Sequence, residues 1–296
     1  MEDSALILKR KYDNGEIIPP QEVQELLNQS PLVNKLLETH DRPPTTFVGL
    51  RNYMWRLVEL SEIPLVHTLG KVQEWIKLLV EKSYISEGFT LEGKRDNLLA
   101  CHSAMITTIL IRMEYEGIKK INAGIDWIVK YQSVERGKEC TWEGKDLYTR
   151  FGGCMKKTPC FYGVVKSVKA LSEYNRRFGG SEELKSKLSQ GLEYILEHEV
   201  YKKLSNGKPI EDSVIQNFYP YTYKSNLLEI LTLLKENGLL EDKRCLDAIN
   251  ILKKNQRSDG FWQADVSYMK SAWIHFDIPK KPGPWITHVI NKLFAE

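Results

Sequence analysis

The apolar positions of this chain follow helical spacing, and two kinds of helix alternate along it. Three segments are apolar on nearly every side, which is typical of helices covered all round: residues 97–115, 158–174 and 225–234. Three others carry a single apolar stripe, which is typical of helices with one face in water: residues 121–132, 184–199 and 246–255. The spacing also predicts a helix over residues 47–60 and a last buried helix over 284–294, and strand signals are almost absent.

This alternation has a simple geometric solution, in which the buried helices form an inner ring and the striped helices an outer ring. That arrangement is an α/α toroid. A linear solenoid of helical hairpins is the alternative, but it would expose one face of each inner helix. We therefore expect an all-α protein with a single α/α-toroid domain over residues 1–296, in which residues 1–45 form a more irregular helical segment.

A sequence block recurs along the chain and supports this architecture. INAGIDWIVKYQ (121–132), LSQGLEYILEHE (188–199) and CLDAINILKKNQ (245–256) align without gaps, residues 72–83 also fit, and residues 29–40 fit more loosely. Two of the blocks continue into a Q…G…W tail, formed by Gln132, Gly137 and Trp142 and by Gln256, Gly260 and Trp262. Because the blocks are unequally spaced, they predict helical hairpins with variable insertions. We interpret each tail as a helix stop whose glutamine bonds to free backbone groups and whose indole covers the junction.

Composition excludes several classes of function. The 42 Lys and Arg residues nearly balance the 39 Asp and Glu residues, so nothing favours nucleic acid or an anionic membrane as a partner. The longest apolar run, residues 98–113, is shorter than the ~20 residues of a membrane span. The N-terminus lacks the pattern of a secretory signal, and the five cysteines are an odd number. We therefore expect a cytoplasmic protein without a transmembrane segment.

The Q…G…W repeat resembles that of squalene/terpene cyclases and protein prenyltransferase β-subunits, which are α/α toroids. More closely, the chain resembles small prokaryotic prenyltransferase/squalene-oxidase-repeat proteins, and the matching segments are residues 101–116, 158–174, 218–234, 255–262 and 282–293. The resemblance covers roughly residues 29–296 and implies an isoprenoid or another apolar ligand in the toroid cavity. The chain departs from these enzymes because it has neither the D-x-D-D string that protonates an alkene nor the D-D-x-x-D string that binds magnesium.

Four cysteines in the central third are candidate zinc ligands: Cys101, Cys140, Cys154 and Cys160. Two of them open inner helices, and the other two lie in the loop between those helices. Inner-helix N-termini meet at one rim of a toroid, so the four thiolates would converge with tetrahedral geometry around zinc. Helix N-termini also favour thiolates. The alternative is that the cysteines are ordinary buried small residues, because the chain has no C-x-x-C pair.

Aromatic side chains gather at the starts of the inner helices and in the loops before them, and we expect them to line an apolar cavity: Phe161, Tyr162, Tyr219, Tyr221, Tyr223, Trp273 and Trp285. The alternative is that they pack as core over one end of the toroid. His102 and His275 are the candidate catalytic bases near this mouth, and His288 is a weaker one.

Two hypotheses about function follow. The first is a protein that acts on or binds an isoprenoid or another apolar small molecule, with zinc as a candidate cofactor. The second is a non-catalytic binding or scaffold module with a structural zinc. A third reading, a carbohydrate-active α/α barrel, needs paired carboxylates across the cavity, and the inner helices offer few.

Overall fold

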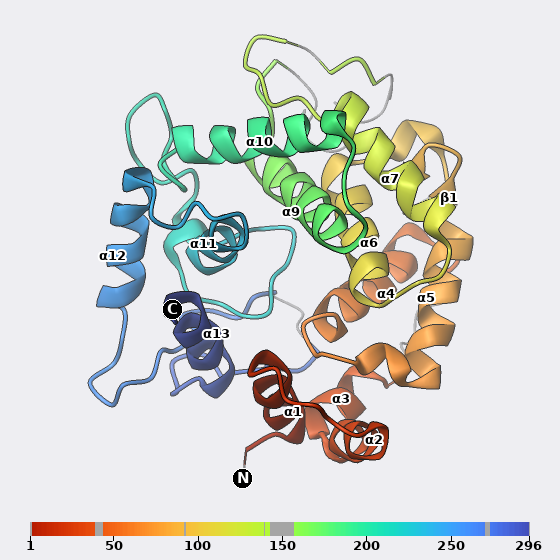
Figure 1. Ribbon diagram of the computed structural model, residues 1–296, viewed down its shortest axis with the longest axis vertical. Helices are drawn as coiled ribbons and strands as arrows, with labels where there is room; N and C mark the ends of the chain where they lie inside the picture. Colours follow the sequence, from red (N-terminus) through yellow and green to blue (C-terminus); the bar gives the residue numbers. More distant parts are fainter. Residues whose placement is uncertain are drawn as a thin grey trace. The chain divides into compact units, whose positions relative to one another are not determined.

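The computed structural model describes residues 2–38, 44–91, 93–138, 140–142, 157–269 and 273–295 (Figure 1). Helices dominate these residues. The only strands among them, β1 (Tyr84–Ile85) and β2 (Gly88–Phe89), pair as a short antiparallel hairpin. The all-α prediction is therefore confirmed. The chain divides into two compact units: unit 1 comprises Met1–Leu79, Asn217–Thr222 and Gln256–Glu296, and unit 2 comprises Val80–Gln216 and Tyr223–Asn255.

Unit 1 is built from short helices of the N-terminal region and from the last helix: α1 (Ser4–Asp13), α2 (Pro20–Gln29), α3 (Pro31–Leu36), α4 (Phe47–Leu60) and α13 (Pro284–Phe294). Helix α5 (Gly70–Ser83) begins in unit 1 and runs into unit 2. The break between α2 and α3 lies at Ser30–Pro31. The Ser30 hydroxyl accepts a hydrogen bond from the Val33 amide at 3.1 Å, and Pro31 occupies the first turn of α3.

Local sequence rules predict the bounds of α4 and α13 well. Helix α4 covers residues 47–60 as expected, and its predicted apolar face, which includes Leu50, Met54 and Leu57, is buried. Helix α13 begins at Pro284 and ends at Phe294, also as expected. The predicted burial of α13 is found on one face, formed by Trp285, Ile286, Ile290 and Leu293, and the other residues reach solvent.

Unit 2 contains the predicted alternation of covered and one-striped helices. Its helices are α6 (Ala100–Arg112), α7 (Ile118–Tyr131), α9 (Phe161–Phe178), α10 (Glu182–Glu197), α11 (Leu227–Glu236) and α12 (Leu246–Lys254). Residues 103–111 of α6 are all buried, and so are most of α9 and α11. Helices α7, α10 and α12 each bury one face only. The predicted alternation of covered and one-striped helices is therefore confirmed for these six helices, and we call α6, α9 and α11 the inner helices of unit 2 and the other three its outer helices.

The three covered helices of unit 2 run in the same direction, with α9 between α6 and α11 (Figure 1). Arg177, near the end of α9, donates to the carbonyl of Ile111 near the end of α6. Asn237, which caps the end of α11, donates to Ser172 in the later half of α9 at 2.9 Å. Consecutive parallel inner helices, each connected through an outer helix, are the local arrangement that an α/α toroid repeats. Closure of the whole chain into one toroid stays a prediction.

The two Q…G…W tails have different roles. The Gln132 amide oxygen accepts from the Ser167 hydroxyl of α9 at 3.0 Å, and its backbone carbonyl accepts from Lys187 of α10 at 3.1 Å. Trp142 is buried beside Trp127 of α7. This first tail therefore joins neighbouring helices, although the Gln132 side chain bonds to a side-chain hydroxyl of α9, where we expected backbone groups. In the second tail, Gln256 donates only to the Gly260 carbonyl of its own turn, where Gly260 adopts a φ of +82°.

The buried face of the last repeat block does not include the leucine at its second position, Leu246. Leu246 is 57 % exposed, whereas Cys245, Ala248 and Leu252 are fully buried. Cysteine and alanine are small and apolar, so they supply the buried face as well as leucine does. Within the described part of the chain, no helix is long and apolar enough to cross a membrane.

Candidate functional site

A row of charged side chains crosses the middle of α9, although the helix is otherwise apolar and covered. Lys166, Lys169, Glu173 and Arg176 are spaced by three, four and three residues, which places them on one face of the helix. Lys166 and Glu173 are each only 3 % exposed. Long ionic side chains are almost never buried this deeply unless they are paired, so their partners determine what this face can do.

Glu229 of α11 is the partner of both lysines. It is 2 % exposed, and its two carboxylate oxygens accept from Lys166 Nζ at 2.8 and 2.6 Å. Lys169 Nζ donates to the same carboxylate at 3.0 Å. Burial by itself would raise the pKa of Glu229, but the two ammonium groups outweigh burial and hold its pKa at about 2. Asn226 fixes the turn that carries Glu229, because its side chain caps α11 by accepting from the Glu229 amide at 3.1 Å.

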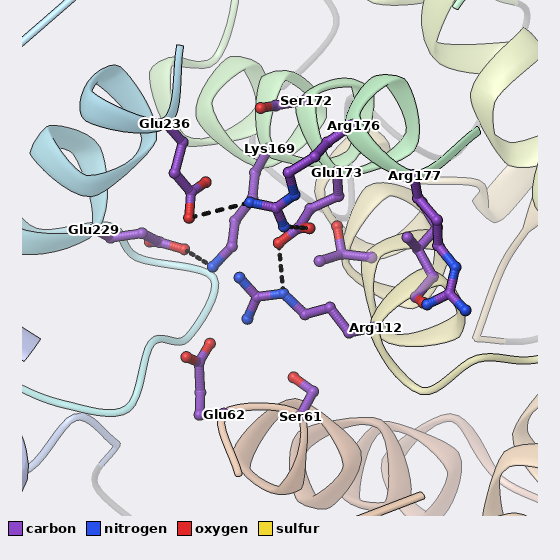
Figure 2. Close-up of polar contacts among 12 residues, drawn as sticks. Ser61, Glu62, Arg112, Lys169, Ser172, Glu173, Arg176, Arg177, Glu229 and Glu236 are labelled. Carbon is purple, nitrogen blue, oxygen red and sulfur yellow. Dashed lines mark hydrogen bonds and ion pairs between the residues drawn. The ribbon is translucent and has the colours of Figure 1, made fainter. Parts of the chain in front are cut away.

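Glu173 is held in the same way by two arginines (Figure 2). Arg112, the last residue of α6, donates from Nε at 2.7 Å, and Arg176 donates from the next turn of α9. Burial opposes ionisation of Glu173, but Arg112 and Arg176 prevail, so the pKa of this carboxyl lies below its usual range. Arg176 also forms an ion pair with Glu236 of α11, in which Nη1 lies 3.6 Å from Oε1. The cluster therefore joins all three inner helices of unit 2.

We call this group the α9 charge cluster: Arg112, Lys166, Lys169, Glu173, Arg176, Glu229 and Glu236. The cluster contains four cationic and three anionic side chains. Glu173 and Glu229 are both ionised at neutral pH because of their lowered pKa values, so neither has a proton to donate as a general acid. Arginine and lysine side chains are the groups that hold negative charge in proteins.

The sequence pattern missed this cluster, although one signal was present. Residues 158–174 were recognised as a covered helix from their apolar residues, and Lys166, Lys169 and Glu173 interrupt that pattern on one helical face. Charged residues at helical spacing within a covered helix indicate a buried ionic group. Their partners could not be found in this way, because Glu229 is 63 residues beyond Lys166 and Glu173 is 61 residues beyond Arg112.

The predicted aromatic residues of unit 1 pack against one another. Tyr219 contacts Tyr221 at a ring-centroid distance of 5.4 Å, and it stacks on Trp285 at 6.2 Å. Phe276 completes the group, 5.5 Å from Tyr219 and 4.9 Å from Trp285. These four side chains are at least nine-tenths buried. Trp273 lies apart from them, stacked against the Arg56 guanidinium at 4.1 Å.

The predicted aromatic residues of unit 2 form a second group, separate from that of unit 1. Phe161 contacts Tyr162, Tyr194 and His198 at ring distances of 6.0, 6.5 and 5.2 Å. Tyr223 differs from the other predicted aromatics because it is 45 % exposed. The structure thus shows core packing within each unit. The shared ligand cavity that we expect these residues to line stays a prediction.

Two of the four predicted zinc ligands interact, at the starts of α6 and α9. Burial is the main reason that the pKa of the Cys101 thiol is raised to about 12, and the nearby Cys160 thiol raises it further. Cys140 is placed differently, because its thiol donates to the Tyr131 carbonyl at 3.1 Å. Cys154 lies outside the described residues. Among the residues that are described, no three His, Cys, Asp or Glu side chains are grouped as a metal site. The zinc prediction therefore depends on Cys154 and is not tested.

The candidate catalytic histidines occupy different environments. His102 is half-buried in the first turn of α6, whereas His275 is exposed in the segment before α13. His288 pairs with Asp13 of α1 at 2.8 Å and so joins two helices of unit 1. The most enclosed histidine among the described residues is His198, which no sequence motif singled out. Its Nδ1 donates to the Lys202 carbonyl at 2.6 Å, and Nε2 accepts from Arg136 at 3.0 Å, so both contacts require the neutral ring.

Unit 2 also has an open cleft between its outer helices. The cleft has a volume of about 970 Å³ and lies between α7 and the start of α10. Polar residues line it, including Asp126, Lys130, Lys187 and Gln190, and so do apolar residues such as Ile125 and Val129. An open groove of this kind differs from the enclosed pockets that usually hold small molecules.

Comparison with known proteins identifies no relative of this chain. No protein-family model matches it, and no curated protein or solved structure is significantly similar to it. The resemblance to the cyclase and prenyltransferase repeat therefore depends on the residues that carry it.

Proposed function

We propose that this protein binds a small apolar molecule with an anionic head group, as in an isoprenyl diphosphate, and that the head group lies at the α9 charge cluster. The observation that carries the proposal is the grouping of four cationic side chains in that cluster. Its two buried carboxylates, Glu173 and Glu229, are each shared by two cations. Arginine and lysine are the side chains that hold anionic groups in proteins.

The residues around the cluster are the reason for proposing that the ligand also has an apolar part. The cluster lies on helices whose other residues are largely aliphatic, such as Ile109 of α6 and Val165 of α9. A ligand that combines an apolar chain with a charged end matches both properties. The resemblance of the Q…G…W repeat to cyclases and prenyltransferases supports an isoprenoid in particular. The proposal concerns binding, because the acid motifs of the cyclases and synthases are missing from the sequence.

Titration calorimetry with three probes tests this function. Farnesyl diphosphate has both parts of the proposed ligand, farnesol has only the chain, and inorganic pyrophosphate has only the charge. We expect farnesyl diphosphate to bind more tightly than either part. Replacing Arg112 with Gln should weaken its binding by about tenfold to a hundredfold, as expected for a lost hydrogen bond between charged groups. The affinity for farnesol should not change.

A matched control is available in the same unit. Arg244 pairs with Asp242 and Glu193 away from the α9 charge cluster, and it is more exposed than Arg112. Arg244→Gln should leave all three affinities unchanged. Equal binding of farnesol and farnesyl diphosphate, or no binding of any probe by the folded protein, would refute the proposal.

The second candidate function is a non-catalytic binding module with a structural zinc. The observation that favours it is the interaction of Cys101 with Cys160 at the starts of neighbouring inner helices. Metal analysis after purification without chelators should then find about one zinc per chain, and Cys160→Ser should lower that content. A metal-free wild-type protein would dispose of this candidate.

A further inference from the structure

Helix α4 in unit 1 buries an acid and a base one turn apart. Arg56 is 4 % exposed and Glu59 is 1 % exposed. Arg56 uses Nη1 to hold the end of α3, because it donates to the Leu36 carbonyl at 2.7 Å. Its guanidinium also stacks on Trp273, from the segment that precedes α13. Arg56 therefore links α4 to two other parts of unit 1.

Glu59 links α4 to that same segment through a single hydroxyl group. Tyr268 Oη lies 2.6 Å from Glu59 Oε1 and 3.1 Å from the Ile274 carbonyl oxygen. Both distances suit a hydrogen bond, but a tyrosine hydroxyl has only one proton to donate. Tyr268 can therefore donate to the carboxylate or to the carbonyl, and not to both at once.

The protonation state of Glu59 decides between these two acceptors. A neutral Glu59 donates its own proton to Tyr268 Oη, which leaves the tyrosine proton for the Ile274 carbonyl. An ionised Glu59 has no proton and takes the tyrosine proton as an acceptor, so the carbonyl loses its donor. All three groups can be bonded in a chain only when Glu59 is neutral.

The groups that face Glu59 do not favour its ionised form strongly. Its Oε2 and the Nη2 of Arg56 are buried and have no hydrogen-bond partner in the part of the chain that the structure describes. Burial raises the pKa of Glu59 to about 7, against the opposing effects of the Tyr268 hydrogen bond and the Arg56 charge. Beyond Arg56, Lys35 and Glu38 at the end of α3 form an ion pair with each other at 2.6 Å. The carboxyl therefore changes charge close to neutral pH.

We propose that Glu59 and Tyr268 form a proton-operated latch between α4 and the segment that precedes α13. In the closed state the proton of Glu59 and that of Tyr268 make a continuous chain from α4 to the Ile274 carbonyl. When Glu59 loses its proton to solvent, Tyr268 donates to the Glu59 carboxylate, and its hydrogen bond to the Ile274 carbonyl is lost. The contacts around Ile274 and its neighbour Trp273 then loosen. This device is independent of the α9 charge cluster and of any ligand bound there.

Fluorine NMR of protein labelled with 5-fluorotryptophan tests the latch. The Trp273 resonance is assigned by its disappearance in Trp273→Phe. In the wild-type protein we expect this resonance to titrate with a midpoint near the Glu59 pKa of about 7. Glu59→Gln, which cannot ionise, should abolish the titration. Tyr268→Phe should abolish the titration as well, because it removes the hydroxyl that links Glu59 to the Ile274 carbonyl.

Glu62→Gln is the matched control, since it removes a carboxyl just beyond the same end of α4. The midpoint should be unchanged in this variant. A wild-type Trp273 resonance that does not titrate between about pH 5.5 and 8.5 would overturn the latch. The same conclusion follows if the titration persists in folded Glu59→Gln. If that variant does not fold, a Trp273 titration that persists in folded Tyr268→Phe overturns the proposal by itself.

Discussion

Replacing the buried pair Lys166 and Glu229 with apolar side chains of similar size measures what the α9 charge cluster contributes to stability. The variants are Lys166→Met, Glu229→Leu and the double variant. Each single substitution leaves one buried charge without its main partner. The double substitution removes both charges and leaves Lys169, which is 12 % exposed in its side chain and is long enough to extend towards water.

The expected magnitudes follow from burial and from the shifted pKa. Lys166 is 3 % exposed, so Glu229→Leu should lower the free energy of unfolding by about 3–5 kcal/mol, the usual cost of an uncompensated buried charge. Lys166→Met should cost less, about 1–3 kcal/mol, because Lys169 still pairs with Glu229. The double variant should lie within about 1 kcal/mol of the wild type, because an apolar pair avoids the cost of desolvating two charges.

Urea unfolding followed by circular dichroism at pH 7 provides the four free energies of the cycle. The prediction is a coupling energy of at least about 2 kcal/mol between the two positions. The reasoning would be refuted if the loss of unfolding free energy in the double variant equalled the sum of the losses in the two single variants. That result would show that the two charges do not compensate each other.

The dependence of the unfolding free energy on pH, measured for the wild type and the double variant, provides a second check. The pKa of Glu229 falls from 4.5 to about 2 on folding, a difference of about 2.5 units or about 3 kcal/mol. Because the pKa is lowered, this stabilisation is present above about pH 4.5 and is lost as the pH falls through about 2. The wild type should therefore lose about 3 kcal/mol more than the double variant across that range.

Three further predictions concern both units. Asp13 is ionised despite burial because His288 and neighbouring lysines lower its pKa, so Asp13→Asn should cost about 1–3 kcal/mol at pH 7. The difference in stability between the wild type and Asp13→Asn, measured by thermal melts, should shrink as the pH falls below the ordinary aspartate pKa of 3.8. A difference of the same size at acid pH would contradict the lowered pKa of Asp13. Gly124→Ala would place a Cβ 2.2 Å from Thr107 Oγ1, so it should destabilise unit 2 by about 1–3 kcal/mol. Adding Thr107→Ala should restore part of that loss in urea unfolding, and an unchanged loss would show that the contact is not the cause. Glu59 has a pKa raised from 4.5 to about 7, so the wild type should lose about 3 kcal/mol of stability as the pH rises through that window. In Glu59→Gln, urea unfolding at about pH 4.5 and at about pH 7 should give the same free energy of unfolding. A variant whose stability depends on pH as much as that of the wild type would disprove the raised pKa of Glu59.

Much of the local structure could be predicted because it depends on neighbours along the chain. The bounds of α4 and α13 follow from the spacing of apolar residues and, for α13, from Pro284 at its start. The alternation of covered and striped helices was also predicted, since it is visible within each segment. The last repeat block shows where such reasoning fails. Leu246 and Cys245 are adjacent and both apolar, and the pattern does not reveal that the cysteine faces inward.

The candidate site depends on contacts that periodicity does not encode. Lys166 meets Glu229 across 63 residues, and Tyr268 meets Glu59 across 209 residues. A helical pattern repeats every 3.6 residues and is complete within one helix, so the spacing of apolar residues is enough to locate the helices and the apolar face of each. Which buried charges meet, and which carboxyl gains or loses affinity for its proton, follows from how the helices pack. The physical reason is that both depend on the distance between helices and on the exclusion of water between them.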